Sequence, residues 1–122
     1  MEISQSVVDS VLSYAKINHP KEGILLLRGK ASKDRILIDG IVIPPSATHG
    51  HGFSIFPLGM LPSALSIVGV AHSHPSGVLQ PSAEDLNHFY GRIMSIRAYP
   101  YDYEKDLAVF DGRGHRMPFS IS

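Results

Sequence analysis

The stretch Ile67-Val68-Gly69-Val70-Ala71-His72, followed at once by Ser73-His74-Pro75, decides how the fold of this chain is read. Its first residues form a short, continuous apolar run, which is typical of a buried β-strand. Side chains two positions apart on a strand point to the same face, so His72 and His74 can approach one ion if the strand stays extended through Ser73. Pro75 favours that geometry because it biases the preceding residue away from helical backbone angles.

A second segment, Ser82-Ala83-Glu84-Asp85, begins after six further residues. A serine followed three positions later by an acidic residue resembles a helix capping box. Such a cap would orient the first turn of a helix, while Asp85 projects from that turn toward the end of the preceding strand. His88 lies on the same helical face as Asp85 and is its rival as a ligand.

Two imidazoles and one carboxylate would supply three ligands to a metal ion. Catalytic zinc is usually held by three protein side chains with the fourth tetrahedral position left to water, whereas structural zinc is closed by four, commonly including cysteine. The chain contains no cysteine. A site built from these residues would therefore be open and able to activate water. The plain alternative for the histidine pair alone is that one ring packs internally and the other lies on the surface.

The segments before this strand predict one helix and a strand pair. Apolar residues at helical spacing predict an amphipathic helix from Ile3 to Ala15, with Ser4 available as its N-cap and His19-Pro20 ending the run. Two strands should follow, at Gly23 to Arg28 and Arg35 to Ile43, joined by a turn at Lys30 to Asp34.

The next segment, Pro44 to Gly52, has no periodicity and reads as a loop, and Phe53 to Phe56 reads as a short strand. The loop carries a second His-x-His pair, His49 and His51. No carboxylate or cysteine lies near this pair in the sequence, so we interpret both as surface residues rather than metal ligands.

Beyond the central strand we expect a helix and a closing set of antiparallel strands. The predicted segments are a helix at Ser82 to Gly91, strands at Arg92 to Ala98, Asp106 to Phe110 and His115 to Ile121, and a last turn at Asp111 to Gly114. Pro118 predicts that the final strand lies at an edge. This order of elements predicts one α+β domain over residues 1–122, with a mixed, mostly antiparallel sheet flanked by helices.

The composition argues against several classes of partner. Eleven basic and eleven acidic side chains give a formal charge of zero, so no broad field favours nucleic acid or an anionic membrane. The lack of cysteine fits a reducing compartment, and no apolar run approaches the length of about 20 residues that spans a bilayer. We therefore expect a soluble, unexported, cytoplasmic protein whose partner is recognised by local shape and hydrogen bonding.

The motif as a whole resembles that of a known family. His72-x-His74, seven intervening residues, Ser82, two residues and Asp85 match the signature of the JAMM metalloproteases, also called MPN-plus or JAB domains. In that family an upstream glutamate at the start of a strand completes the site, and Glu22 occupies the corresponding place. Element order and size extend the resemblance over essentially the whole chain, to a minimal, stand-alone prokaryotic or archaeal member. The resemblance implies the cytidine-deaminase-like JAMM/MPN fold.

The resemblance also implies a role for each residue of the motif. His72, His74 and Asp85 would bind one Zn²⁺ per chain. Glu22 would act as the general base, and Ser82 would donate a hydrogen bond to the oxygen that becomes anionic in the tetrahedral intermediate. Taken without the motif, Glu22 reads as an exposed carboxylate at a helix-to-strand junction.

The reaction implied by the resemblance is hydrolysis of the bond after the C-terminal diglycine of a ubiquitin-like modifier, as in a desampylase or deubiquitinase, an omega-peptidase. The partner would be a ubiquitin-like or sulfur-carrier protein ending in Gly-Gly, and we place the sheet edge that binds this tail at Phe53 to Phe56. Two alternatives stay open. One is a peptidase that processes the C-terminus of a sulfur carrier, and the other is a non-catalytic MPN scaffold.

Overall fold

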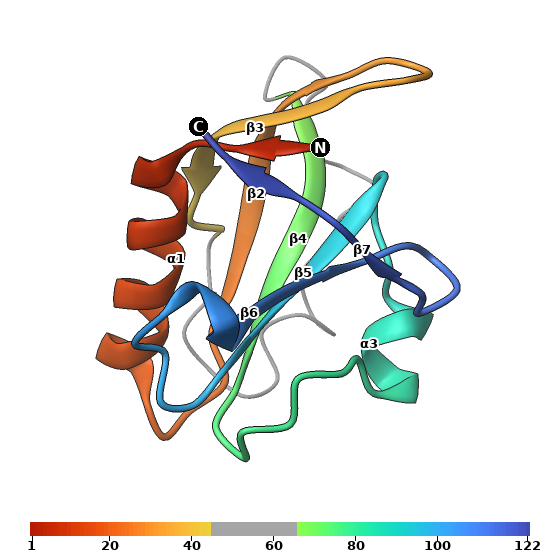
Figure 1. The fold of residues 1–122 in the computed structure, drawn as a ribbon. Coiled ribbons are helices and arrows are strands. Elements are labelled where there is room, and N and C mark those ends of the chain that lie inside the picture. Colours follow the sequence, from red (N-terminus) through yellow and green to blue (C-terminus); the bar gives the residue numbers. More distant parts are fainter. Residues whose placement is uncertain (45–65) are drawn as a thin grey trace.

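The computed structural model describes residues 1–44 and 66–122. They form one sheet, with helix α1 (Gln5–Asn18) along one side and the short helix α3 (Ala83–Asn87) on the other (Figure 1). The strands lie in the order β7-β6-β5-β4-β2-β3-β1-β8. In chain order they are β1 (Glu2–Ile3), β2 (Ile24–Ala31), β3 (Ile36–Val42), β4 (Ile67–His74), β5 (Ile93–Ala98), β6 (Leu107–Phe110), β7 (Arg116–Met117) and β8 (Ser120–Ile121), and a 3₁₀ helix, η3 (Glu104–Asp106), precedes β6.

The centre of the sheet is β4, which pairs antiparallel with β2 and parallel with β5. The pairs β1–β3 and β1–β8 are also parallel, whereas β2–β3, β5–β6 and β6–β7 are antiparallel. The predicted α+β class with a mixed sheet is thus confirmed. The central strand is two residues longer than the predicted apolar run, because it stays extended through His74.

The sheet curls around α1, because its two edge strands are neighbours in the sequence. Only Pro118 and Phe119 separate β7, at one edge, from β8, at the other. The single strand predicted from His115 to Ile121 is therefore wrong, since the chain leaves one edge and joins the opposite one. The edge position predicted from Pro118 is confirmed, and proline suits this break because it has no N–H to donate to a ladder.

Helix α1 begins at the predicted cap. The Ser4 hydroxyl accepts a hydrogen bond from the Val7 N–H at 3.3 Å, which satisfies one of the donors left free at a helix start. The helix continues to Asn18, three residues beyond the predicted Ala15. Ile3, predicted as part of the helix, lies instead in β1, where it pairs with Ile38 of β3.

From Val70 onward, alternation along β4 directs successive side chains to opposite faces of the sheet, each with its own apolar cluster. Ala71 packs in the cluster that includes α1, whereas Val70 packs in a second cluster on the opposite face, with Leu26 and Met94. Successive side chains of a strand point to opposite faces. His72 and His74 therefore share the face of Val70, away from α1, and Ser73 shares the face of Ala71.

The helix predicted from Ser82 to Gly91 is shorter in the structure and ends at Asn87. Gly91 has a φ of +80°, which side chains other than glycine rarely adopt. The N–H of Arg92 donates to the Val68 carbonyl at 2.7 Å, so the chain is already turning onto β4 to start β5. A longer helix would prevent that turn.

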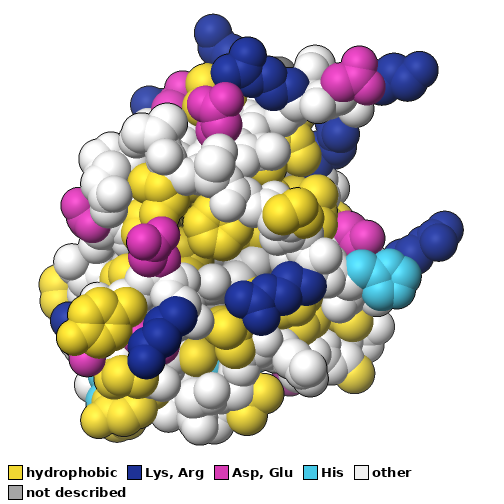
Figure 2. Space-filling model, viewed as in Figure 1, with side chains coloured by type: hydrophobic (Ala, Val, Ile, Leu, Met, Phe, Trp, Pro, Cys, Tyr) yellow, Lys and Arg dark blue, Asp and Glu magenta, His cyan; other side chains and the backbone are white. Residues whose placement is uncertain are grey.

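The predicted loop with His49 and His51 and the predicted strand at Phe53 to Phe56 lie outside the described residues. In the part of the chain that is described, no helix has the length and apolar character needed to cross a membrane. On the face shown in Figure 2, basic and acidic side chains are interspersed rather than separated by sign.

Replacing Gly69 with alanine should destabilise the fold. Gly69 pairs with Ile93 across the parallel β4–β5 ladder, and a Cβ there would lie 2.1 Å from the Ile93 carbonyl oxygen. The strands would have to separate, and overpacking of this kind costs about 1–3 kcal/mol. Urea unfolding followed by circular dichroism measures the loss.

Gly40→Ala is the matched control, because the nearest atoms to its Cβ belong to the exposed side chain of Arg28, at 3.2 Å. This variant should change the free energy of unfolding by less than about 0.5 kcal/mol. Equal losses in the two variants would show that the close approach of β4 to β5 is not what requires glycine.

Candidate metal centre and active site

The candidate site lies at the C-terminal end of β4, where His72 and His74 point away from α1. Their side chains are 8% and 11% exposed. The Nδ1 atom of His74 lies 2.9 Å from the Val78 carbonyl oxygen. Because a carbonyl can only accept, this contact places a proton on Nδ1 and turns Nε2 toward Asp85.

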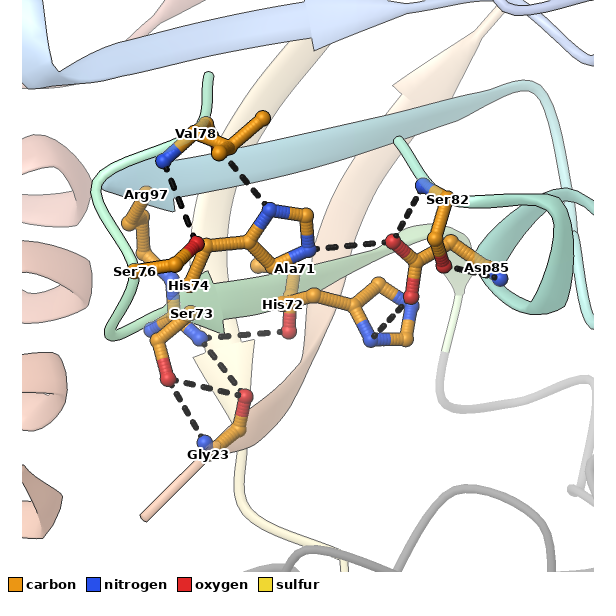
Figure 3. A network of polar contacts seen from close by, with 10 residues as sticks. All are labelled: Gly23, Ala71, His72, Ser73, His74, Ser76, Val78, Ser82, Asp85 and Arg97. Carbon is orange, nitrogen blue, oxygen red and sulfur yellow. Dashed lines mark hydrogen bonds and ion pairs between the residues drawn. The ribbon is translucent and has the colours of Figure 1, made fainter. Parts of the chain in front are cut away.

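Asp85 takes part in two sets of contacts at once (Figure 3). One carboxylate oxygen, Oδ2, accepts the Ser82 N–H at 2.8 Å, while the Ser82 hydroxyl accepts the Asp85 N–H at 3.0 Å. This reciprocal pair is a capping box, as the sequence suggested. The same Oδ2 lies 3.0 Å from His74 Nε2, and Oδ1 lies 3.7 Å from His72 Nδ1. The cap therefore fixes the carboxylate where both imidazoles can reach it.

Glu22 approaches the same place from the start of β2. Ile24 pairs with His72 in the antiparallel β2–β4 ladder, and the Ser73 N–H donates to the Gly23 carbonyl at 3.0 Å. Continuing this register places Glu22 opposite His74 and on the same face of the sheet. The five residues predicted from the motif, Glu22, His72, His74, Ser82 and Asp85, all line one cavity of about 310 Å³.

His88, the predicted rival of Asp85, is placed differently. It is the C-cap residue of α3, and it is not among the described residues that line the cavity. The helix therefore directs Asp85 toward β4 and ends at the position of His88.

Electrostatics set the protonation states of the three central side chains. Burial lowers the pKa of His72 to about 4. The negative charge of Asp85 opposes this shift, whereas the positive charge of Arg97 adds to it. Burial alone would also lower the pKa of His74, but hydrogen bonds to Asp85 and to the Val78 carbonyl outweigh it and raise the pKa above its usual value.

For Asp85, burial favours the neutral acid, yet the hydrogen bonds from His74 and from the Ser82 backbone lower its pKa to about 2. At neutral pH the site therefore contains a neutral His72 and an ionised Asp85. These are the forms in which imidazole and carboxylate bind metal ions.

The donor set fits a zinc ion in kind, with two imidazole nitrogens and one carboxylate. Among residues 1–44 and 66–122, no group of three or more histidine or acidic side chains is already arranged around a common point, as a bound metal ion would require. Instead, Asp85 contacts each of the two imidazoles directly. Ligand atoms of a tetrahedral zinc site lie roughly 3.3 Å apart, and the contacts here are 3.0 and 3.7 Å. The two contacts that Asp85 makes are thus close to the ligand spacing of a zinc site.

Two buried polar residues beside the site, Ser73 and Arg97, could not be identified from the motif. Both are 0% exposed. In the sequence, Ser73 is only the residue between two histidines, and Arg97 is one residue of a predicted strand. A charged residue inside the mostly apolar segment Ile93–Ala98 is the available signal, because arginine is almost never fully buried unless it is paired.

Comparison with known proteins establishes the family. The chain belongs to the family described as prokaryotic homologs of the JAB domain, whose model matches residues 4–109. A Haloferax volcanii protein named "Probable metalloprotease" is 32% identical over 120 residues, which covers 92% of this chain and 73% of that protein. The resemblance inferred from the motif is confirmed.

Solved structures agree with the fold. A JAB1/MPN domain protein from Archaeoglobus fulgidus has a TM-score of 0.74 and 27% identity, covering 100% of this chain and 96% of its own. A structure described as "JAMM: A Metalloprotease-like Zinc Site in the Proteasome and Signalosome" has a TM-score of 0.72 and 29% identity, with coverage of 100% and 97%. The predicted JAMM/MPN fold is therefore confirmed.

The buried, neutral state of His72 should make the metal-free protein sensitive to acid. Its pKa of about 4 lies below the usual 6.5, so the unfolded chain binds the proton first and stability is lost as the pH falls from about 6.5 toward 4. Between about pH 7.5 and about pH 4.5 this residue should contribute a loss of about 2 kcal/mol.

The measurement is urea unfolding in the presence of a chelator, for the wild type and His72→Gln, at a series of pH values. The stability difference between the two proteins should shrink by that amount on acidification, because glutamine does not titrate. A difference in unfolding free energy that stays constant over the whole pH range would contradict the lowered pKa assigned to His72.

Proposed function

We propose that this protein is a zinc metalloprotease that hydrolyses the bond after the C-terminal diglycine of a ubiquitin-like modifier or sulfur-carrier protein. One observation carries the proposal: Glu22, two histidines of β4, and Ser82 and Asp85 of the α3 region line a single cavity. Membership of the JAB family and the metalloprotease name of the Haloferax relative support it.

His72, His74 and Asp85 would hold the metal. The capping box orients Asp85, and the Val78 carbonyl orients His74, and such supporting contacts commonly fix metal ligands. A zinc ion bound by these three residues would lower the pKa of a water ligand to about 7 and polarise the scissile carbonyl.

Glu22 would serve as the general base. As the attacking water adds to the carbonyl carbon, the Glu22 carboxylate accepts one proton from that water. It then returns the proton to the amine nitrogen as the C–N bond breaks, so glutamate ends the cycle ionised. The second proton of the water remains on the new carboxyl group, which at neutral pH gives it to the amine, and the products are a carboxylate and an ammonium group. Continuing the β2–β4 register from Ile24 would put Glu22 opposite His74 and on the face of the metal ligands, which supports this role.

Ser82 can cap the helix and assist catalysis at the same time. In the cap, its hydroxyl oxygen accepts the Asp85 N–H. A serine hydroxyl has one proton to donate besides its acceptor lone pairs, so that proton stays available to the oxygen that becomes negatively charged in the tetrahedral intermediate.

An extended diglycine tail suits the proposed substrate class. Two glycines have no side chains to collide with the cavity walls, so their backbone can come close to the metal ligands. The tail can also add main-chain hydrogen bonds to a strand edge. We keep Phe53 to Phe56, which precede β4, as the proposed edge.

Purified protein should contain about one zinc per chain, measured by mass spectrometry of metals. Asp85→Asn removes the charge but keeps an oxygen that can cap α3, and it should weaken zinc binding by more than the roughly 10–100-fold seen for supporting residues. His72→Ala should do the same. His88→Ala, the control for the rival ligand, should retain zinc. If Asp85→Asn retained zinc and His88→Ala lost it, the assignment of Asp85 as the third ligand would be overturned.

Glu22→Gln should abolish most hydrolysis without releasing zinc. General base catalysis commonly contributes about 10²–10⁴-fold, so kcat should fall by that range. The assay follows release of free modifier from a conjugate joined through its C-terminal glycine to a lysine, with a chelator as the negative control.

Glu84→Gln is the matched variant, because Glu84 is an exposed carboxylate that lines the same cavity; it should stay active. A sulfur carrier extended at its C-terminus by a short peptide serves as a second substrate, since the same residues would cleave either bond. No chelator-sensitive cleavage of either substrate by the zinc-loaded wild type would favour the scaffold alternative.

A further inference from the structure

We propose that Ser73 and Arg97 are positioning residues, which hold the chain at Gly23 so that the neighbouring Glu22 faces the metal ligands. This inference rests on the proposed role of Glu22 as the base. Neither residue lines the site cavity among the residues described. They act on the other face of the sheet, through the backbone.

Ser73 makes the closest contact. Its hydroxyl oxygen accepts the Gly23 N–H at 2.6 Å, and its own N–H donates to the Gly23 carbonyl at 3.0 Å. Both polar groups of the Gly23 backbone are therefore bound by one residue of β4. Figure 3 shows the Ser73 side chain directed to Gly23, while the His72 and His74 rings are directed to Asp85.

Arg97 also donates a hydrogen bond to the Gly23 carbonyl. Its Nη2 donates to the Gly23 oxygen at 3.0 Å and to the Ala71 oxygen at 3.3 Å, and its Nη1 donates to the Val11 oxygen at 2.9 Å. One guanidinium thus ties together α1, the start of β2, and β4. Its rigid fork of donors makes this possible, and a lysine ammonium could not reproduce it.

The burial of Arg97 is costly, which argues for a specific use. Within residues 1–44 and 66–122 it forms no salt bridge with a carboxylate, and its hydrogen bonds go to main-chain carbonyls. A buried charge without an opposite partner is expensive, and well-packed apolar residues commonly replace such groups without loss. What an apolar side chain cannot supply at this position is a donor to the Gly23 carbonyl.

Glycine is suited to position 23 because it has no side chain. A Cβ there would lie 3.2 Å from Asn18 Nδ2 and 3.3 Å from Tyr14 Cε2. The chain between α1 and β2 therefore packs closely against α1 on one face of the sheet. Alternation turns the preceding residue, Glu22, to the opposite face.

The three residues at the end of β4 thereby carry two functions. His72 and His74 supply the metal ligands, and Ser73, between them, fixes the backbone next to the base. The two histidine ligands and the backbone next to the base are thus held by one strand, so the separation of the imidazoles from Glu22 is set by strand geometry rather than by a loop. A displacement of about 1 Å in such a group can lower the rate by about 100-fold.

The test is a double-mutant cycle measured by steady-state hydrolysis of the modifier–lysine conjugate. Ser73→Ala should lower kcat by about 10-fold or more with KM and zinc content unchanged, and Ser73→Thr, which keeps the hydroxyl, should recover most of it. In a Glu22→Gln background, Ser73→Ala should cost nothing further, because the base it positions is gone. Equal losses in both backgrounds would overturn the proposal.

Ser95→Ala is the matched control. Ser95 is a buried serine on β5, paired with Ala71, and its hydroxyl has no hydrogen-bond partner among the described residues. Removing it should leave kcat unchanged in either background.

A second measurement does not depend on activity. Hydrogen exchange by NMR, on metal-free and zinc-loaded protein, should show the Gly23 amide exchanging about 10-fold faster or more in Ser73→Ala, and faster in Arg97→Lys, with β4 amides still protected. An unchanged Gly23 amide would overturn the proposal even if the enzyme is active. Absence of hydrolysis by the wild type, with faster Gly23 exchange in the variants, would instead overturn the proposed function alone.

Discussion

The antiparallel pairing of β2 with β4 is the constraint on which the site depends. Ile24 lies opposite His72, and this single register decides that Glu22 meets His74 and that Gly23 meets Ser73. A slip of one residue would turn every side chain of one strand to the other face. Apolar clusters on both faces of the sheet oppose such a slip, because Val70 and Ala71 are each fully buried in a different cluster. Core packing therefore holds the spacing of the polar residues.

Asp85 shows how a short helix can be made part of a site. A helix of five residues cannot be stable by itself. Its first turn is closed by the capping box with Ser82, and its carboxylate is tied to His74 at 3.0 Å. The same contacts keep Asp85 ionised, with a pKa of about 2. The segment that delivers the third ligand is thus ordered by the interactions that prepare that ligand for a cation.

Much of the architecture could be predicted from local patterns. Ser4 marked the start of α1, and β4 could be predicted because a short continuous apolar run, rich in β-branched residues, is typical of a buried strand. The predictions failed where distant contacts override local preference. α3 ends at Asn87 because Arg92 must reach Val68, and the last predicted strand divides at Pro118 because its two halves join opposite edges of the sheet. The role of Ser73 could not be predicted, since a serine between two histidines has no signature of its own. Arg97 was marked only as a charged residue in a mostly apolar strand, and its hydrogen-bonding partners are distant in the chain.

The sequence by itself determined the family and the identity of the candidate site residues, because the spacing of His72, His74, Ser82 and Asp85 is a local pattern that needs no fold to be read. Only the tertiary structure decided that Glu22 shares a cavity with them, and that a buried arginine holds the adjacent backbone. The physical reason is that these contacts join residues some 50 to 74 positions apart in the chain. Strand register and burial, rather than sequence spacing, bring them together.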